Sequence, residues 1–282
     1  MRTLGFILAS AAVCLLLAGS ALATSTGWIT MSFYNVSPGE NVNYVAPGKS
    51  GSTTAGVYNQ KVYLHPNYWD DLLDSDGDGI PDQEASQLIA SLGTADGNAG
   101  KTTAWAYAST FCADIKQYAS GSFLRYDIYK PEDAPIGGTQ NPMGPTKAAD
   151  LRKLFDNYSV YGLGALPYTL GTTTYGASQT SAAFQASVWE IIYETSAYDV
   201  KKDAFQISSG ETWTGLSNYW LTHLGTVDPC LGLRVLVNGD QQDFAIVVPG
   251  VGRDPIPEPV TMAGLMLGIG SVLTYVRKRR MA

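Results

Sequence analysis

The chain has 282 residues, of which 45% are hydrophobic and only 15% charged, so it can bury a hydrophobic core in one large or two small domains. Its formal net charge is −7. An acidic chain repels phosphate groups, which argues against binding to nucleic acid or to an anionic membrane surface.

Residues 1–23 have the pattern of a secretory signal peptide. Arg2 supplies the positive start, an apolar run covers residues 4–18, and Ala21-Leu22-Ala23 offers small residues for cleavage. We expect the mature chain to begin at Thr24 and to be exported.

Residues 28–62 contain short apolar runs of the kind that form strands, separated by turn residues. In chain order the runs and turns are 28–34, Gly39, 43–45, Pro47-Gly48, Gly51 and 56–58. This pattern predicts several short strands of an antiparallel sheet.

The acidic segment 74–85 matches the front of an EF-hand-like calcium loop. Its oxygen ligands would come from Asp74, Asp76, Asp78, the carbonyl of Ile80, and Asp82. The segment resembles the DxDxDG loops of thrombospondin type 3 and dockerin-like repeats, which implies calcium as a cofactor. Its twelfth position is Ala85 rather than the usual glutamate, so the alternative is a solvated acidic turn before a helix at 83–92.

Further elements follow from hydrophobic periodicity and turn signals. We expect strands at 102–118 and 126–129, helices at 147–158, 180–194 and 211–224, a loop at 162–178, and a hairpin of 233–237 and 244–248 around Asn238-Gly239. In the first of these strands, Trp105 and Tyr107 are expected on the buried face. The predicted fold class is α+β, mainly an antiparallel sheet or sandwich with three or four helices.

The helix at 180–194 has the clearest pattern of the exported part. Phe184, Val188 and the pair Ile191-Ile192 form one apolar stripe, and Thr180 or Ser181 is expected to cap the first turn. Gln185 is the exception. Its side-chain amide is expected on the buried side of the helix, so it needs either hydrogen-bond partners or a covalent bond to another group.

The exported part contains two cysteines, Cys112 and Cys230. Because export leads to an oxidising environment, a disulfide between them is the first interpretation. A second interpretation instead joins Cys112 to Gln185.

The second interpretation depends on two short motifs. Phe111-Cys112-Ala113-Asp114 on a strand, followed by Gln185-Ala186-Ser187-Val188-Trp189 on a helix, resembles the thioester domain of bacterial surface adhesins, here covering residues 24–250. The resemblance implies that the Cys112 thiolate attacks the Gln185 side-chain carbonyl, expels ammonia and leaves an internal thioester. Phe111, Phe184, Trp189 and Trp105 are expected to exclude water from that bond.

The same resemblance implies how such a bond would be used. An amine or a sugar hydroxyl on a target surface would take the Gln185 acyl group and release Cys112. Each molecule would attach once, so the protein would be an adhesive rather than an enzyme that turns over.

Residues 251–282 have the pattern of a second targeting signal. Pro257-Glu258-Pro259 precedes an apolar run at 260–276 that is just long enough to span a bilayer, and Arg277-Lys278-Arg279-Arg280 follows. The three parts in this order resemble the PEP-CTERM sorting signal of Gram-negative bacteria, which implies an exosortase as partner. They imply an intermediate anchored in the inner membrane before delivery to the cell surface or beyond. An ordinary single-pass anchor is the alternative.

The part of the chain between the two signals is more acidic than the whole chain. Five of the 18 basic residues are Arg2 and the four at 277–280, while all 25 acidic residues lie between Arg2 and Arg277, so that stretch carries a net charge of −12. Common enzyme signatures, such as a Gly-x-Ser-x-Gly elbow, a His-Glu-x-x-His helix or a Walker loop, are absent from the sequence.

The sequence thus predicts an exported thioester-type attachment module. The alternative is a structural or glycan-binding matrix component, stapled by Cys112–Cys230 and stabilised by calcium.

Overall fold

The computed structural model describes residues 25–63, 105–136, 141–194, 197–208, 210–226 and 232–248. The signal peptide, the acidic segment 74–85, Cys230 and the sorting signal 251–282 all lie outside these described residues. Within them, no helix is both long and apolar enough to cross a membrane.

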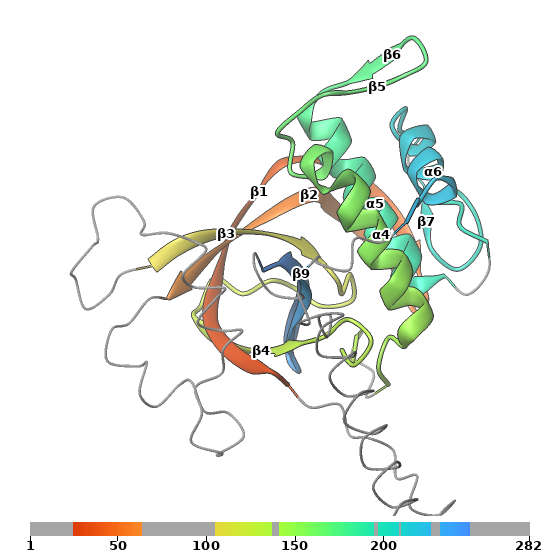
Figure 1. The fold of residues 1–282 in the computed structure, drawn as a ribbon. Helices are drawn as coiled ribbons and strands as arrows, with labels where there is room; N and C mark the ends of the chain where they lie inside the picture. The colour runs from red at the N-terminus through yellow and green to blue at the C-terminus, as the bar shows by residue number, and fades with distance from the viewer. Residues whose placement is uncertain are drawn as a thin grey trace, which may run out of the picture.

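The main sheet is antiparallel at every pairing and closes on itself (Figure 1). Its strands are β1 (Gly27–Ala46), β2 (Lys49–Tyr63), β3 (Trp105–Cys112), β4 (Leu124–Tyr129), β7 (Gln206–Ile207), β8 (Leu233–Asn238) and β9 (Gln241–Val247). The order is β2-β3-β9-β8-β4-β1-β7, and β1 also pairs with β2. The long β1 makes the closure, because its first residues pair with β4 and its later residues with β2.

The expectation of several short strands before residue 63 was wrong, because β1 and β2 form one long hairpin. Only Pro47-Gly48 makes a turn, where Gly48 has a φ of +78°. Gly39 lies inside β1 opposite Gly56, and a Cβ added to Gly56 would stand 2.3 Å from the carbonyl oxygen of Pro38. These two glycines therefore permit a close approach of β1 and β2. The sequence around each glycine does not reveal this approach, because the two glycines meet only through strand pairing.

Three helices occur in the described residues, at the predicted places: α4 (Pro145–Gly162), α5 (Ala177–Tyr193) and α6 (Thr214–Thr222). The expectation of an unstructured loop at 162–178 was wrong, since a small hairpin of β5 (Tyr168–Leu170) and β6 (Thr173–Tyr175) lies there. Helix α5 is central: it contacts β1, β2 and β3 on one side and both other helices on the other (Figure 1).

The burial of α5 exceeds what an amphipathic stripe requires. Every residue from Thr180 to Tyr193 is buried, because the sheet and two helices surround the helix. The expected cap at Thr180 or Ser181 was wrong, since the helix begins at Ala177 after Gly176. The Thr180 hydroxyl instead donates to the backbone carbonyls of Gly176 and Ala177 within the first turn.

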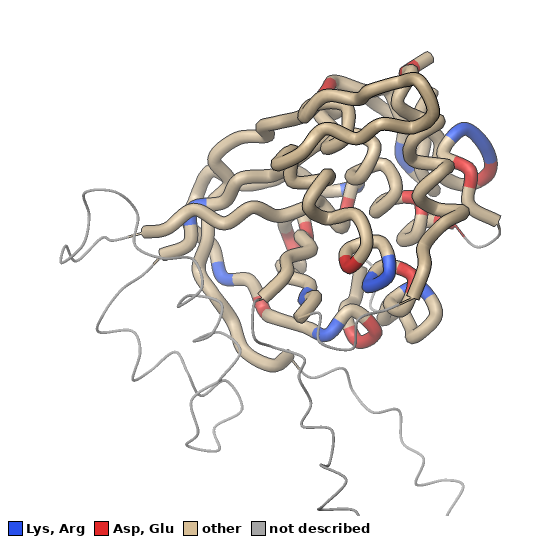
Figure 2. Tube along the Cα trace, turned by 45° about the horizontal axis from the view of Figure 1, so that its top comes forward, with Lys and Arg blue, Asp and Glu red and all other residues tan. Residues whose placement is uncertain are grey.

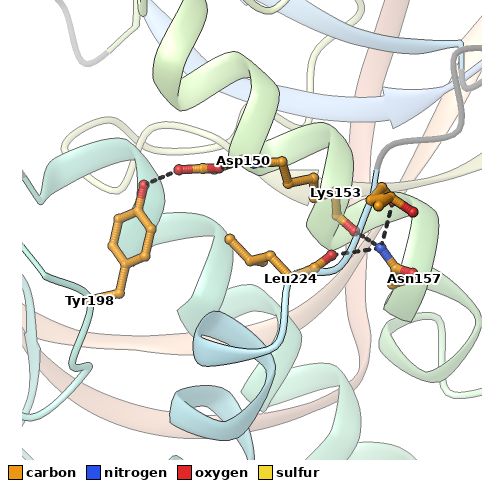
Figure 3. A network of polar contacts seen from close by, with 6 residues as sticks. Asp150, Lys153, Asn157, Tyr198 and Leu224 are labelled. Carbon is orange, nitrogen blue, oxygen red and sulfur yellow. Dashed lines mark hydrogen bonds and ion pairs between the residues drawn. The ribbon is translucent and has the colours of Figure 1, made fainter.

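Polar side chains on α4 hold two later segments of the chain in place (Figure 3). The Asn157 amide donates to the carbonyl of Lys153 at 2.8 Å and to that of Leu224, after α6, at 2.7 Å. The Tyr198 hydroxyl donates to Asp150 at 3.0 Å. Helix α4 thereby holds Tyr198, in the segment that follows α5, and Leu224, just after α6.

Two buried carboxyl groups near the end of α5 bind backbone N–H groups of the following segment. Oε1 of Glu190 accepts from Asp199 N–H at 2.6 Å, and Oε2 of Glu194 accepts from Ala204 N–H at 2.8 Å. Burial, with the nearby carboxylate of Glu194 adding to it, raises the pKa of Glu190 to about 8. Glu190 therefore keeps its proton at neutral pH in the folded chain.

A Gly162→Ala substitution tests the packing between α4 and α5. A Cβ at this position would lie 2.4 Å from Cγ of Phe184, whose ring is held by Phe111 and Phe155. We expect the free energy of unfolding to fall by about 1–3 kcal/mol, as for other overpacked cores. Chemical denaturation measures it. Gly215→Ala in α6 is the matched control, because a Cβ there meets nothing within 4 Å and alanine favours the helix; equal losses in both variants would contradict the packing.

The raised pKa of Glu190 predicts that stability depends on pH. Between about pH 4.5 and 8 the folded chain retains this proton while the unfolded chain loses it, so the free energy of unfolding falls as pH rises. The slope from one such group is at most about 1.4 kcal/mol per pH unit. Glu190→Gln keeps the acceptor oxygen and removes the titration, so denaturation curves across this range should show a shallower fall. A variant with the wild-type slope would refute the assignment.

Candidate functional site

Cys112 and Gln185 meet where α5 passes the end of β3. Cys112 is the last residue of β3, its side chain is fully buried, and it forms no disulfide within the described residues. Gln185 lies in the middle of α5 and is equally buried. The fold thus joins two residues that are 73 positions apart in the sequence.

The Gln185 amide pairs with the backbone of Cys112 through two hydrogen bonds. Its Oε1 accepts from Cys112 N–H at 2.8 Å, and its Nε2 donates to the Cys112 carbonyl at 2.9 Å. The pairing of β2 with β3 stops at Tyr58 and Thr110, so Gln185 takes the place of a strand neighbour at Cys112. A buried backbone group needs a partner, and the amide provides one for both groups at once.

Trp189 lies one turn after Gln185 on α5 and contacts the sulfur of Cys112. Its indole Nε1–H donates to Cys112 Sγ at 3.3 Å. Burial raises the pKa of the Cys112 thiol well above its ordinary value, and the indole N–H opposes that rise in part. In the resting site Cys112 is therefore a neutral thiol with an oriented sulfur.

Tyr193 lies one turn further along the same stripe and reaches the residues after Cys112. Its hydroxyl donates to Oδ1 of the fully buried Asp114 at 2.8 Å and accepts from Ile115 N–H at 3.1 Å. Oδ1 of Asp114 also accepts from Lys116 N–H at 2.8 Å. Three side chains of α5 spaced four residues apart therefore hold the 112–115 segment in order.

Aromatic side chains enclose the site, though not all of those expected. The rings of Phe111 and Phe184 are 4.6 Å apart, and Trp189 packs against Phe205 at 5.9 Å, all in the buried core. The placement of Trp105 and Tyr107 on the buried face was wrong: Tyr107 is 47% exposed, whereas the small Ala106 and Ala108 point inward. Trp105 belongs to the outer face of β3 and takes no part in excluding water from Cys112.

A second buried carboxyl group lies nearby on β9. Asp243 accepts from Asn238 N–H at 2.9 Å through Oδ1, and its backbone carbonyl accepts from Ala113 N–H at 2.7 Å. Burial, with the charge of Asp114 adding to it, raises the pKa of Asp243 to about 8, so this group is protonated at neutral pH.

The sequence motifs indicated Cys112, Gln185 and Trp189, and the structure brings these three together. They gave no role to Asp114 or Tyr193, although the spacing of Tyr193 from Gln185, two helical turns, is a signal that could have found it. The calcium residues and Cys230 lie outside the described residues. In the described ranges, no group of three or more His, Cys, Asp or Glu could hold a metal ion.

Charged residues of both signs are spread over the described part of the chain. Acidic and basic positions are scattered along the described trace rather than gathered on one element (Figure 2). This distribution, together with the acidic balance, gives no basic stripe of the kind that follows a phosphate backbone in the part of the chain that the structure describes.

Comparison of the chain with protein-family models, curated proteins and solved structures found no match.

Proposed function

We propose that this chain is an exported attachment protein in which Cys112 and Gln185 form an internal thioester that couples the protein covalently to a target surface. The observation that carries the proposal is the pair of hydrogen bonds between the Gln185 amide and the Cys112 backbone. These hydrogen bonds keep the electrophilic side-chain carbonyl of Gln185 beside Cys112, whose thiol would attack it, before any covalent bond forms.

The contacts suit the closure reaction. As Sγ adds to the side-chain carbonyl carbon of Gln185, negative charge develops on Oε1, which already accepts the N–H of Cys112 at 2.8 Å. The S–C bond forms, the C–N bond breaks, and the thiol proton leaves with the amide nitrogen as ammonia. The Trp189 N–H, at 3.3 Å from Sγ, orients the sulfur for the attack.

Complete burial of both residues supports the persistence of the product. Water hydrolyses a thioester, and the side chains of Cys112, Gln185 and Trp189 are all inaccessible to it. When an amine or hydroxyl of a target reaches the bond, it takes the Gln185 acyl group and the Cys112 thiol is released. The reaction occurs once per molecule.

The two ends of the chain complete the proposal. The signal peptide 1–23 delivers the protein out of the cytoplasm, and residues 251–282 act as a PEP-CTERM signal with a membrane helix at 260–276 that an exosortase recognises. The protein passes through an inner-membrane intermediate to the cell surface. Calcium bound at Asp74, Asp76, Asp78, Ile80 and Asp82 belongs to the same proposal.

Intact-mass measurement of the purified chain tests the thioester. We expect a mass lower by one ammonia than the sequence requires, no free Cys112 thiol, and uptake of methylamine at Gln185. Cys112→Ala and Gln185→Ala should both restore the full mass, because each removes one of the two bonded atoms.

Cys230→Ala is the matched control. It should leave the loss of ammonia unchanged. A loss of two hydrogens that disappears in Cys112→Ala and in Cys230→Ala would instead show the Cys112–Cys230 disulfide and overturn the thioester.

A second candidate function, saccharide binding, has support from the outer face of the sheet. Tyr34 and Tyr107 are 50% and 47% exposed and their ring centroids lie 5.4 Å apart. The Lys61 ammonium stands 4.6 Å from the Tyr34 centroid and 4.8 Å from that of Trp105. Exposed rings beside a cationic donor suit stacking and hydrogen bonding to sugar rings. On this alternative, the protein is a matrix component without covalent chemistry.

Affinity electrophoresis in gels that contain bacterial polysaccharide tests this alternative. Replacing Tyr34 and Tyr107 together by alanine should weaken retardation at least about tenfold, since each stacked ring contributes on the order of 1 kcal/mol. Tyr118→Ala is the control, because Tyr118 is 79% exposed but does not belong to this face. Equal retardation of all three proteins would exclude the outer face as a saccharide site.

A further inference from the structure

In the segment that follows Cys112, one carboxyl oxygen is buried and has no hydrogen-bond partner among the described residues. It is Oδ2 of Asp114, a residue with 0% exposure. The other oxygen, Oδ1, receives the Tyr193 hydroxyl and the Lys116 N–H, both at 2.8 Å. Leaving a buried oxygen without a donor costs free energy, so the arrangement calls for a role that uses this oxygen.

Closure of the thioester has an unmet requirement that such an oxygen could satisfy. The thiol must lose its proton as sulfur attacks, and burial raises the pKa of Cys112 so far that a free thiolate is disfavoured. A proton acceptor has to stand beside the thiol. Asp114 lies two residues further along the chain, and its backbone N–H is near enough to the sulfur to oppose part of the rise in the pKa of the thiol.

The other ionisable neighbours of Cys112 do not fit this role. Asp243 holds its own proton at neutral pH, because burial raises its pKa to about 8. The hydroxyls of Tyr44, Tyr58 and Tyr193 have pKa values raised by burial, so each remains protonated. Asp114 is the group that remains among the described residues.

We propose that Asp114 accepts the thiol proton of Cys112 on Oδ2 as sulfur attacks Gln185, and returns a proton to the departing amide nitrogen. The proton leaves with ammonia, the carboxylate is regenerated, and no further reactant is needed. Tyr193 is a positioning residue, since its hydroxyl holds Oδ1 and thereby directs Oδ2. This inference rests on the proposed function.

The rate of closure tests the role of Asp114. The full chain is made by cell-free synthesis, and samples taken over time are analysed by intact mass for loss of ammonia. Asp114→Asn keeps an acceptor oxygen for Tyr193 and Lys116 but cannot take up a proton, so closure should slow on the order of 100-fold. Asp114→Glu restores a carboxyl group and should recover part of the rate. Asp127→Asn, a change on the outer face of β4, is the control and should close like the wild type.

The outcomes separate the two proposals. A wild type that never loses ammonia overturns the proposed function itself. If the wild type closes and Asp114→Asn closes equally fast, the thioester stands and the role of Asp114 is refuted. Thermal unfolding shows whether each variant is folded. Should Asp114→Asn not fold, Tyr193→Phe decides: it keeps the ring and removes the hydroxyl, so slower closure supports the inference and an unchanged rate overturns it.

Discussion

The structure around the candidate site depends on one constraint, the need to satisfy the backbone of β3 where β2 no longer accompanies it. Beyond Thr110 the strand has lost that neighbour, and Cys112 would present a bare N–H and carbonyl to the core. The Gln185 amide supplies a donor and an acceptor in the geometry of a strand. An aliphatic residue at 185 would leave both backbone groups unsatisfied.

This requirement explains why α5 is buried on all sides. For Gln185 to reach the strand, the helix axis must lie close to the sheet, and α4 and α6 then cover its outer faces. The close approach of Gly162 to Phe184 follows from the same geometry, since a side chain at 162 would displace the ring next to Gln185. The hydrogen bonds from Trp189 and Tyr193 extend the contact from a single pair to the whole 112–115 segment.

Much of this could be predicted from the sequence where the signal is local. The buried residues of α4, namely Ala148, Leu151, Leu154 and Phe155, follow from periodicity alone, and the hairpin of β8 and β9 follows from Asn238-Gly239. Alternation identified two faces of β3, but it led to the wrong one being assigned as buried at Trp105 and Tyr107. The large Trp105 and Tyr107 lie on the outer face, where Lys61 and Tyr34 contact them, and these contacts come from other strands of the sheet. Similarly, the contact of Asp114 with Tyr193 depends on how α5 crosses the sheet, and no spacing within either motif encodes it.

The length of β3 sets a large distance between the residues at its two ends. Tyr63 and Trp105 are paired neighbours, so residues 64–104 leave and rejoin the sheet at one point. Cys112 stands at the opposite end of β3, on the order of 23 Å away at the usual rise of a strand. The side chains of Tyr63 and Trp105 at this junction therefore lie too far from Cys112 to contact its sulfur.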